Sequence, residues 1–168
     1  MISKINISEI FVDHFATLKN ESTGKISASD IAVFLISPLL LAGASYYLVW
    51  SFSETATNLV ITGMSIFAGL MINVLVLIYT VALNTQSKNS TEAESAIERR
   101  FLRQIFANIS FSICISVFIV VLAGVAFFVS ATSKQILTAI TIFLLGNFLL
   151  TLFMILKRLH ILLTRRFS

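Results

Sequence analysis

The residues whose types and spacing could support chemistry are uncharged polar ones inside a long apolar segment, residues 58–83. They recur close to the period of an α-helix and therefore fall on one face over about five turns. They are Thr62, Ser65, Gly69, Asn73 and Thr80. Such side chains let membrane helices pack and hydrogen-bond, and they also line water-filled paths. Helix packing and pore lining both stay open for this face, and the expected lining residues are Thr62, Ser65, Gly69 and Asn73.

Two further features add to this pattern. Asn147 lies about ten residues before the end of its apolar segment, as Asn73 does in its own, so both are expected roughly 15 Å from the same boundary. Asn147 is therefore a second candidate for a pore-lining residue. Pro38 lies inside an earlier apolar segment. Because proline has no N–H, it frees the carbonyl of Phe34, and we predict a helix kink there.

Residues suited to catalysis or metal binding are sparse. His14 and His160 lie at opposite ends of the chain, and neither has a Cys, Asp or Glu at metal-ligand spacing on the same helix face. The single cysteine, Cys114, lies within an apolar segment. The apolar segments contain serines but no acid or base at depth, and no glycine-rich phosphate loop follows a strand. The sequence therefore predicts a protein that is not an enzyme and that holds no metal and no cofactor. The same lack of buried charge argues against an ion-coupled carrier.

The composition explains where these residues must lie. The chain has 168 residues, of which 57% are apolar and 12% charged, against about 45–50% and about 25% in ordinary soluble domains. The charges are missing from two long stretches: Glu54 is the only acid or base between Ile31 and Lys88, and Lys134 is the only one between Phe106 and Leu156. A soluble enzyme or a solvated nucleic-acid-binding domain needs a polar surface that these stretches do not provide.

The apolar residues form four blocks, residues 31–50, 58–83, 106–129 and 135–156. Each has at least the roughly 20 residues that a helix needs to cross a membrane. The expected fold is an all-α integral membrane four-helix bundle made of two helical hairpins. The expected regions are an amphipathic cytoplasmic helix (1–26), a transmembrane hairpin (27–83), a cytoplasmic loop and helix (84–105), a second transmembrane hairpin (106–156) and a basic cytoplasmic tail (157–168).

Basic residues indicate the orientation. Eleven of the twelve Lys and Arg residues fall on one side of the predicted spans, so the positive-inside rule places both termini and the central loop in the cytoplasm. The basic residues expected to contact anionic lipid or an acidic partner are Arg99, Arg100, Arg103, Lys157, Arg158, Arg165 and Arg166. Direct binding of nucleic acid is the less favoured alternative.

Three strings of residues suggest a family. They are Thr23-Gly24-Lys25-Ile26-Ser27-Ala28-Ser29-Asp30, Ile61-Thr62-Gly63-Met64-Ser65-Ile66-Phe67-Ala68-Gly69-Leu70 and Gln104-Ile105-Phe106-Ala107-Asn108-Ile109-Ser110-Phe111. They resemble strings of small bacterial four-span membrane proteins found in anti-phage defence operons, and the size and layout are similar to those of the membrane subunit of the Kiwa system. The resemblance implies a multi-pass inner-membrane protein that assembles as a homo-oligomer, a tetramer, and works with a cytosolic defence protein.

These patterns lead to two functional hypotheses. The first is an oligomeric antiviral-defence membrane protein that forms a regulated ion channel, or depolarising effector, under the control of a cytosolic partner or signal. The alternative is a non-conducting membrane scaffold or sensor that recruits a cytosolic defence partner.

Overall fold

The computed structural model of the chain describes residues 7–18, 32–85 and 92–167. The elements are α1 (Ser8–Ala16), the π-helical segment η2 (Ala32–Ile36), α3 (Ser37–Tyr47), α4 (Glu54–Thr85), α5 (Glu92–Val125) and α6 (Ala131–Phe167). The described residues contain helices and no strand, which confirms the all-α expectation.

Three of these helices are long and apolar enough to cross a membrane. Their candidate spans are Glu54–Thr80 in α4, Arg99–Val125 in α5 and Ala131–Ile161 in α6. Each exceeds the roughly 20 residues that a hydrocarbon core of about 30 Å requires. Only 11% of the most apolar stretch of α4 and 22% of that of α6 is buried by the rest of the chain. The remaining apolar surface needs apolar surroundings, which indicates insertion into a membrane.

Among the described residues, the helical part of the first expected span is Ala32–Tyr47. It is an apolar helix below the length of the other three, about 24 Å at 1.5 Å per residue. The winding changes from π to α where η2 ends at Ile36, and Pro38 follows as the second residue of α3. Proline is tolerated there because the first turn of an α-helix leaves its N–H groups unpaired.

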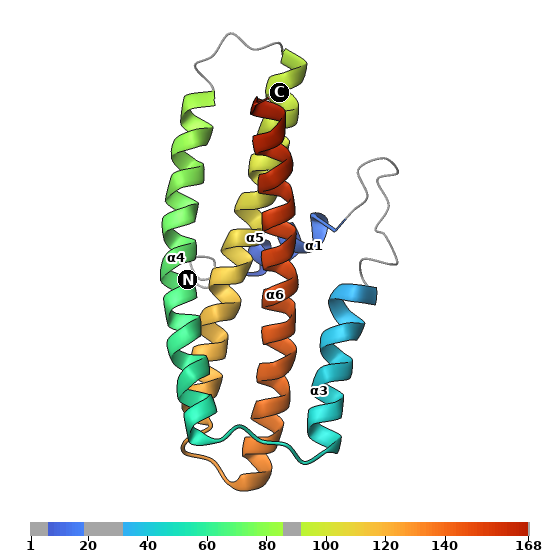
Figure 1. Cartoon of the computed structure of the whole chain (residues 1–168), viewed down its shortest axis with the longest axis vertical. Coiled ribbons are helices and arrows are strands. Elements are labelled where there is room, and N and C mark those ends of the chain that lie inside the picture. The colour runs from blue at the N-terminus through green and yellow to red at the C-terminus, as the bar shows by residue number, and fades with distance from the viewer. Residues whose placement is uncertain (1–6, 19–31, 86–91, 168) are drawn as a thin grey trace.

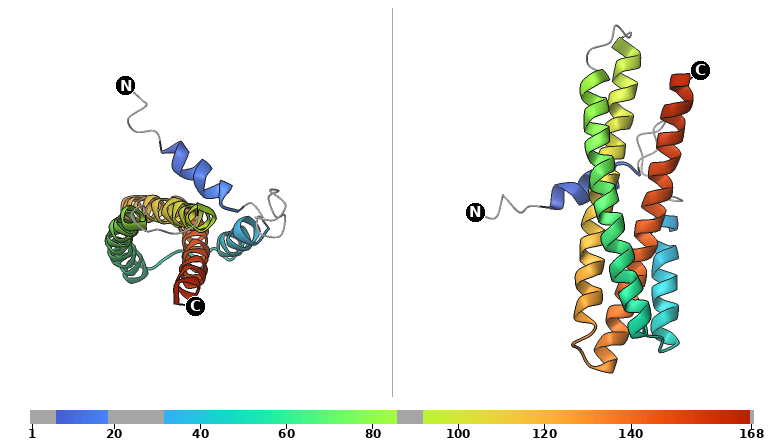
Figure 2. Two further views of the ribbon diagram at one scale, coloured as in Figure 1. Left: turned by 90° about the horizontal axis from the view of Figure 1, so that it is seen from above. Right: turned by 60° about the vertical axis from the view of Figure 1, so that its left-hand side comes forward.

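The described helices pack around α5 and α6. In the described structure α5 packs against both α4 and α6, and α3 packs against α6 and not against α4 (Figures 1 and 2). Among the described residues, α5 and α6 form a packed hairpin, whereas α3 and α4 do not pack against each other. The division of residues 27–83 and 106–156 into two transmembrane hairpins stays a prediction. A close approach explains the position of α3: a Cβ atom on Gly146 of α6 would lie 2.9 Å from the Cβ of Pro38. Glycine at this point lets the two backbones meet.

The apolar core joins α4, α5 and α6. One cluster of buried side chains is formed by Met64, Phe111, Ile115, Ile119 and Phe148, and a second by Ile78, Leu102, Ile105, Ile109 and Ile155. The ring of Phe67 in α4 meets that of Phe148 in α6 edge to face, with centroids 5.5 Å apart. The face of α4 that packs inward is thus the apolar one, opposite the polar residues.

The first helix lies across the long helices and packs against α5 (Figure 2). It is shorter than the helix expected within residues 1–26, since it ends at Ala16 and is followed by a turn at Thr17 and Leu18. Its contact point on α5, Asn108, lies 17 residues before Val125, which is about 26 Å along the helix. The first helix is therefore close to one edge of a hydrocarbon core about 30 Å thick.

Candidate functional site

The polar residues of α4 form one exposed row. Thr62, Ser65, Gly69 and Asn73 are all exposed in the single chain. They point away from the packed side of α4, where Met64 and Ile78 are buried in the core. We call Thr62, Ser65, Gly69, Asn73 and Thr80 the outer face of α4.

Two of the three hydroxyl groups of this outer face, those of Ser65 and Thr80, are satisfied within α4, but the amide of Asn73 is not. Ser65 Oγ donates to the carbonyl of Ile61 at 2.7 Å, and Thr80 Oγ1 donates to the carbonyl of Val76 at 2.9 Å. Among the described residues, none forms a hydrogen bond with the side chain of Asn73. An unpaired amide in hydrocarbon costs several kcal/mol, on the order of 2–7. Asn73 therefore requires water or a second molecule.

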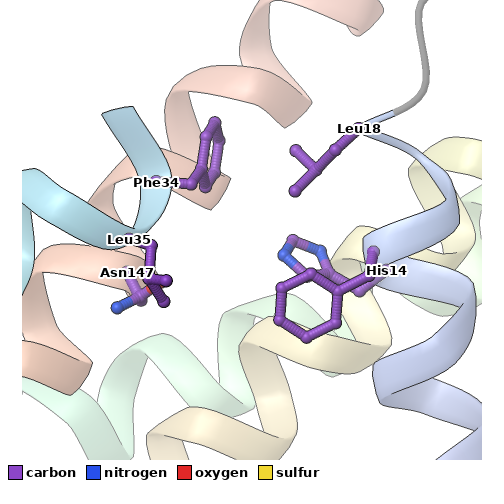
Figure 3. Close-up of a pocket in the computed structure, with 6 residues that line it drawn as sticks. His14, Leu18, Phe34, Leu35 and Asn147 are labelled. Atoms are coloured by element: carbon purple, nitrogen blue, oxygen red, sulfur yellow. The ribbon is translucent and has the colours of Figure 1, made fainter. Parts of the chain in front are cut away.

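Asn147 belongs to a different part of the protein. It is half-buried on α6, and its Nδ2 donates to the carbonyl of Phe143 at 3.0 Å. It lines a cavity of about 100 Å³ together with His14, Phe34 and other residues of α1 and η2, and no residue of α4 contributes. Figure 3 shows Asn147 and His14 on opposite sides of this cavity. The structure thus places Asn147 apart from the outer face of α4.

A second polar site lies where α1 meets α5 and α6. His14 is 1% exposed, and its Nδ1 donates to Oδ1 of Asn108 at 2.9 Å. The Thr17 hydroxyl lies 2.7 Å from the carbonyl of His14 and 3.0 Å from the same Asn108 oxygen, and it can donate to either. From α6, Nη2 of Arg158 donates to the carbonyl of Thr17 at 2.7 Å. We call these four residues the α1 junction.

The imidazole of His14 is held as a neutral group. It stacks on the ring of Phe111 at a centroid distance of 3.6 Å and an interplanar angle of 4°. Burial lowers the pKa of His14 from 6.5 to about 4, and the charge of Arg158 adds to this effect, while the hydrogen bond to Asn108 opposes it. At neutral pH the imidazole is therefore uncharged, with its proton on Nδ1.

Two buried polar atoms close to the α1 junction have no partner among the described residues. They are Nδ2 of Asn108 and Oγ of Ser112, which lie one turn apart on α5. The junction is therefore well connected through Asn108 Oδ1 but not completely satisfied.

Sequence reasoning considered His14 only as a metal ligand and missed its packing role. His14 follows Phe11 by three residues and precedes Leu18 by four, so it shares their helix face. A histidine on the apolar face of an amphipathic helix is the signal that could have identified it. Within the described chain, no group of three or more His, Cys, Asp or Glu residues could hold a metal ion.

The basic residues have different surroundings. Arg99, Arg100 and Arg103 on α5 and Lys157 on α6 are exposed. Arg158, expected at a lipid or partner surface, is half-buried and binds α1 within the chain. Arg165 and Arg166 lie within α6, but their side chains are outside the described residues.

Comparisons with protein-family models, curated proteins and solved structures found no match to this chain. The fold and the two polar sites define an all-helical protein with three helices that are suited to a membrane.

Proposed function

We propose that the chain forms a homo-oligomer in a membrane, in which the outer faces of α4 from neighbouring copies surround a water-accessible path that conducts ions. The observation that carries this proposal is the exposure of Asn73, without an intrachain partner, in line with Thr62, Ser65 and Gly69. In this arrangement water or the amide of another copy satisfies Asn73.

The length of the outer face favours a water-accessible path rather than a local contact between two helices. Thr62 and Thr80 are 18 residues apart, about 27 Å along the helix, which approaches the full thickness of a hydrocarbon core. A single pair of packed helices needs few such groups, whereas pore walls are polar over most of their length. The lack of charge on this face suits a path with neither an acidic nor a basic selectivity ring.

The biological setting rests on sequence resemblance. We propose that the protein acts in the bacterial inner membrane as a multi-pass effector of phage defence, with both termini in the cytoplasm. A cytosolic partner or signal would open the path and depolarise the infected cell. The tetramer implied by the same resemblance would bring four copies of α4 around one axis.

Cysteine substitutions test the path directly. In a Cys114→Ser background, Asn73→Cys and Ser65→Cys are reconstituted in liposomes and treated with a charged, water-soluble thiol reagent. We expect modification of both and a change in ion flux, because the reagent reaches only thiols that contact water. Leu70→Cys is the matched control, since Leu70 is 50% exposed on another part of the same helix. Cross-linking between copies without modification would contradict the path and leave helix packing.

A second candidate function is a non-conducting scaffold that recruits a cytosolic defence protein. The observation that favours it is the exposure of Arg99, Arg100 and Arg103, of which Arg100 and Arg103 line a cavity with residues of α1. Reversing these three residues to Glu separates the candidates. Loss of partner recruitment with no flux in any state supports the scaffold, whereas altered flux without a partner supports the channel.

A further inference from the structure

A second cavity, of about 240 Å³, lies between α1 and α5. Asp13 of α1 and Thr17 in the turn after it line one side, and Arg100, Arg103 and Gln104 of α5 line the other. Thr17 is buried, whereas Asp13 and the two arginines are exposed. The cavity therefore has a closed base beside the α1 junction and a charged opening.

The charges around this opening do not neutralise one another. Among the described residues, the Asp13 carboxylate forms no ion pair with Arg100 or Arg103. The two arginines are three residues apart on one helix and so project from the same side of α5. Two guanidinium groups and one carboxylate thus share a single cavity. A guanidinium group can donate two parallel hydrogen bonds to the oxygens of a phosphate. A carboxylate accepts hydrogen bonds from an ammonium group.

The depth of the cavity points to a lipid. Arg103 precedes Val125 by 22 residues, about 33 Å along the helix. This distance is just beyond a hydrocarbon core of about 30 Å, at the level of the phospholipid headgroups. Basic pockets beside membrane helices at this level bind lipid phosphates.

We propose that the cavity binds the headgroup of a phospholipid that carries both a phosphate and a primary ammonium group, as phosphatidylethanolamine does. Arg100 and Arg103 bind the phosphate, and Asp13 accepts hydrogen bonds from the ammonium. A headgroup with only negative charge faces the carboxylate of Asp13 and binds less well. The bound lipid bridges α1 and α5 next to the α1 junction. This site is independent of the path proposed for α4.

Native mass spectrometry of the delipidated full chain in detergent tests the site. The probes are short-chain phosphatidylethanolamine, short-chain phosphatidylglycerol and inorganic phosphate. We expect phosphatidylethanolamine to bind in preference to the other two. Arg100→Gln and Arg103→Gln should each weaken its binding about five-fold, the effect of removing one basic contact to a headgroup. Asp13→Asn should abolish the preference over phosphatidylglycerol without abolishing binding.

Arg99→Gln is the matched control. Arg99 is exposed and precedes Arg100, but it does not line the cavity, so its loss should leave the affinity unchanged. An equal effect of Arg99→Gln and Arg100→Gln would overturn the site in favour of general charge attraction. Equal affinity for inorganic phosphate would overturn the lipid as the ligand, and an unchanged preference in Asp13→Asn would overturn the role of the carboxylate. Hydrogen exchange of α1, if unchanged in each variant, shows that α1 remains docked.

Discussion

The outer face of α4 and the α1 junction both place an asparagine on a long apolar helix, but their surroundings differ. Asn108 is completely buried, and its Oδ1 accepts from His14 with Thr17 at 3.0 Å. Asn73 is exposed, and no described residue bonds to its side chain. Asn108 thus holds α1 on α5 within the chain. Asn73 on α4 instead leaves an amide that can bind water or a second molecule.

Two glycines differ in the same way: one is packed within the chain and the other has open space beside it. Gly146 lies against Pro38, so that a Cβ there would clash, whereas a Cβ on Gly69 would meet nothing within 4 Å. Close approach at Gly146 is used within the chain. The open space at Gly69 belongs to the outer face of α4, which we propose lines the path.

The largest expected effect comes from replacing the two asparagines by leucine. Asn108→Leu leaves the buried Nδ1–H of His14 without its acceptor, whereas Thr17 keeps the carbonyl of His14. We expect a loss of up to about 3 kcal/mol in unfolding free energy, together with faster hydrogen exchange in α1. Asn73→Leu should change the stability of the dissociated chain by less than about 0.5 kcal/mol and abolish ion flux. Thermal unfolding in dilute detergent and liposome flux measure the two effects. Equal destabilisation by both variants would remove the contrast.

The α1 junction should also weaken in acid. The pKa of His14 is about 4 when docked and 6.5 ordinarily, so the undocked helix binds a proton more readily. Docking is at full strength above about pH 6.5 and loses on the order of 3 kcal/mol as the pH falls to about 4. Hydrogen exchange of α1 across this range measures the loss. His14→Gln keeps a donor but does not titrate, so its α1 should show a much flatter pH response.

The glycines provide a smaller contrast. Gly146→Ala should destabilise the chain by about 1–3 kcal/mol, because the new methyl group forces α3 away from α6. Gly69→Ala should leave the isolated chain unchanged or slightly more stable, since alanine is the better helix former. Unfolding in dilute detergent tests the pair. A stable Gly146→Ala variant would show that α3 is free to shift.

The smallest effect is expected at Ser65. Its hydroxyl bonds to its own helix, so Ser65→Ala should alter unfolding by about 0.5 kcal/mol or less. The same variant should retain ion flux, because the row keeps Thr62 and Asn73. Complete loss of flux would mean that this hydroxyl, rather than the amide of Asn73, is the decisive group of the outer face.

The sequence predicted where the helices lie in the chain better than it predicted which helices pack against one another. Hydropathy alone located α4, α5 and α6, since long apolar runs have few other structures available in a membrane. The helical period also separated the packed and exposed faces of α4. The pairing of α3 with α6 could not be predicted, because it depends on the approach of Pro38 to Gly146, 108 residues apart in the chain. The burial of His14 required knowing that the opposing surface of α5 presents Asn108 and Phe111.

The continuity of α6 has a mechanical consequence. One unbroken helix joins Gly146, where α3 rests, to Arg158, which binds α1, over about 18 Å. A continuous helix of this kind would carry a displacement at Gly146 to Arg158, and from there to the carbonyl of Thr17. We therefore expect the docking of α1 to be mechanically linked to the position of α3.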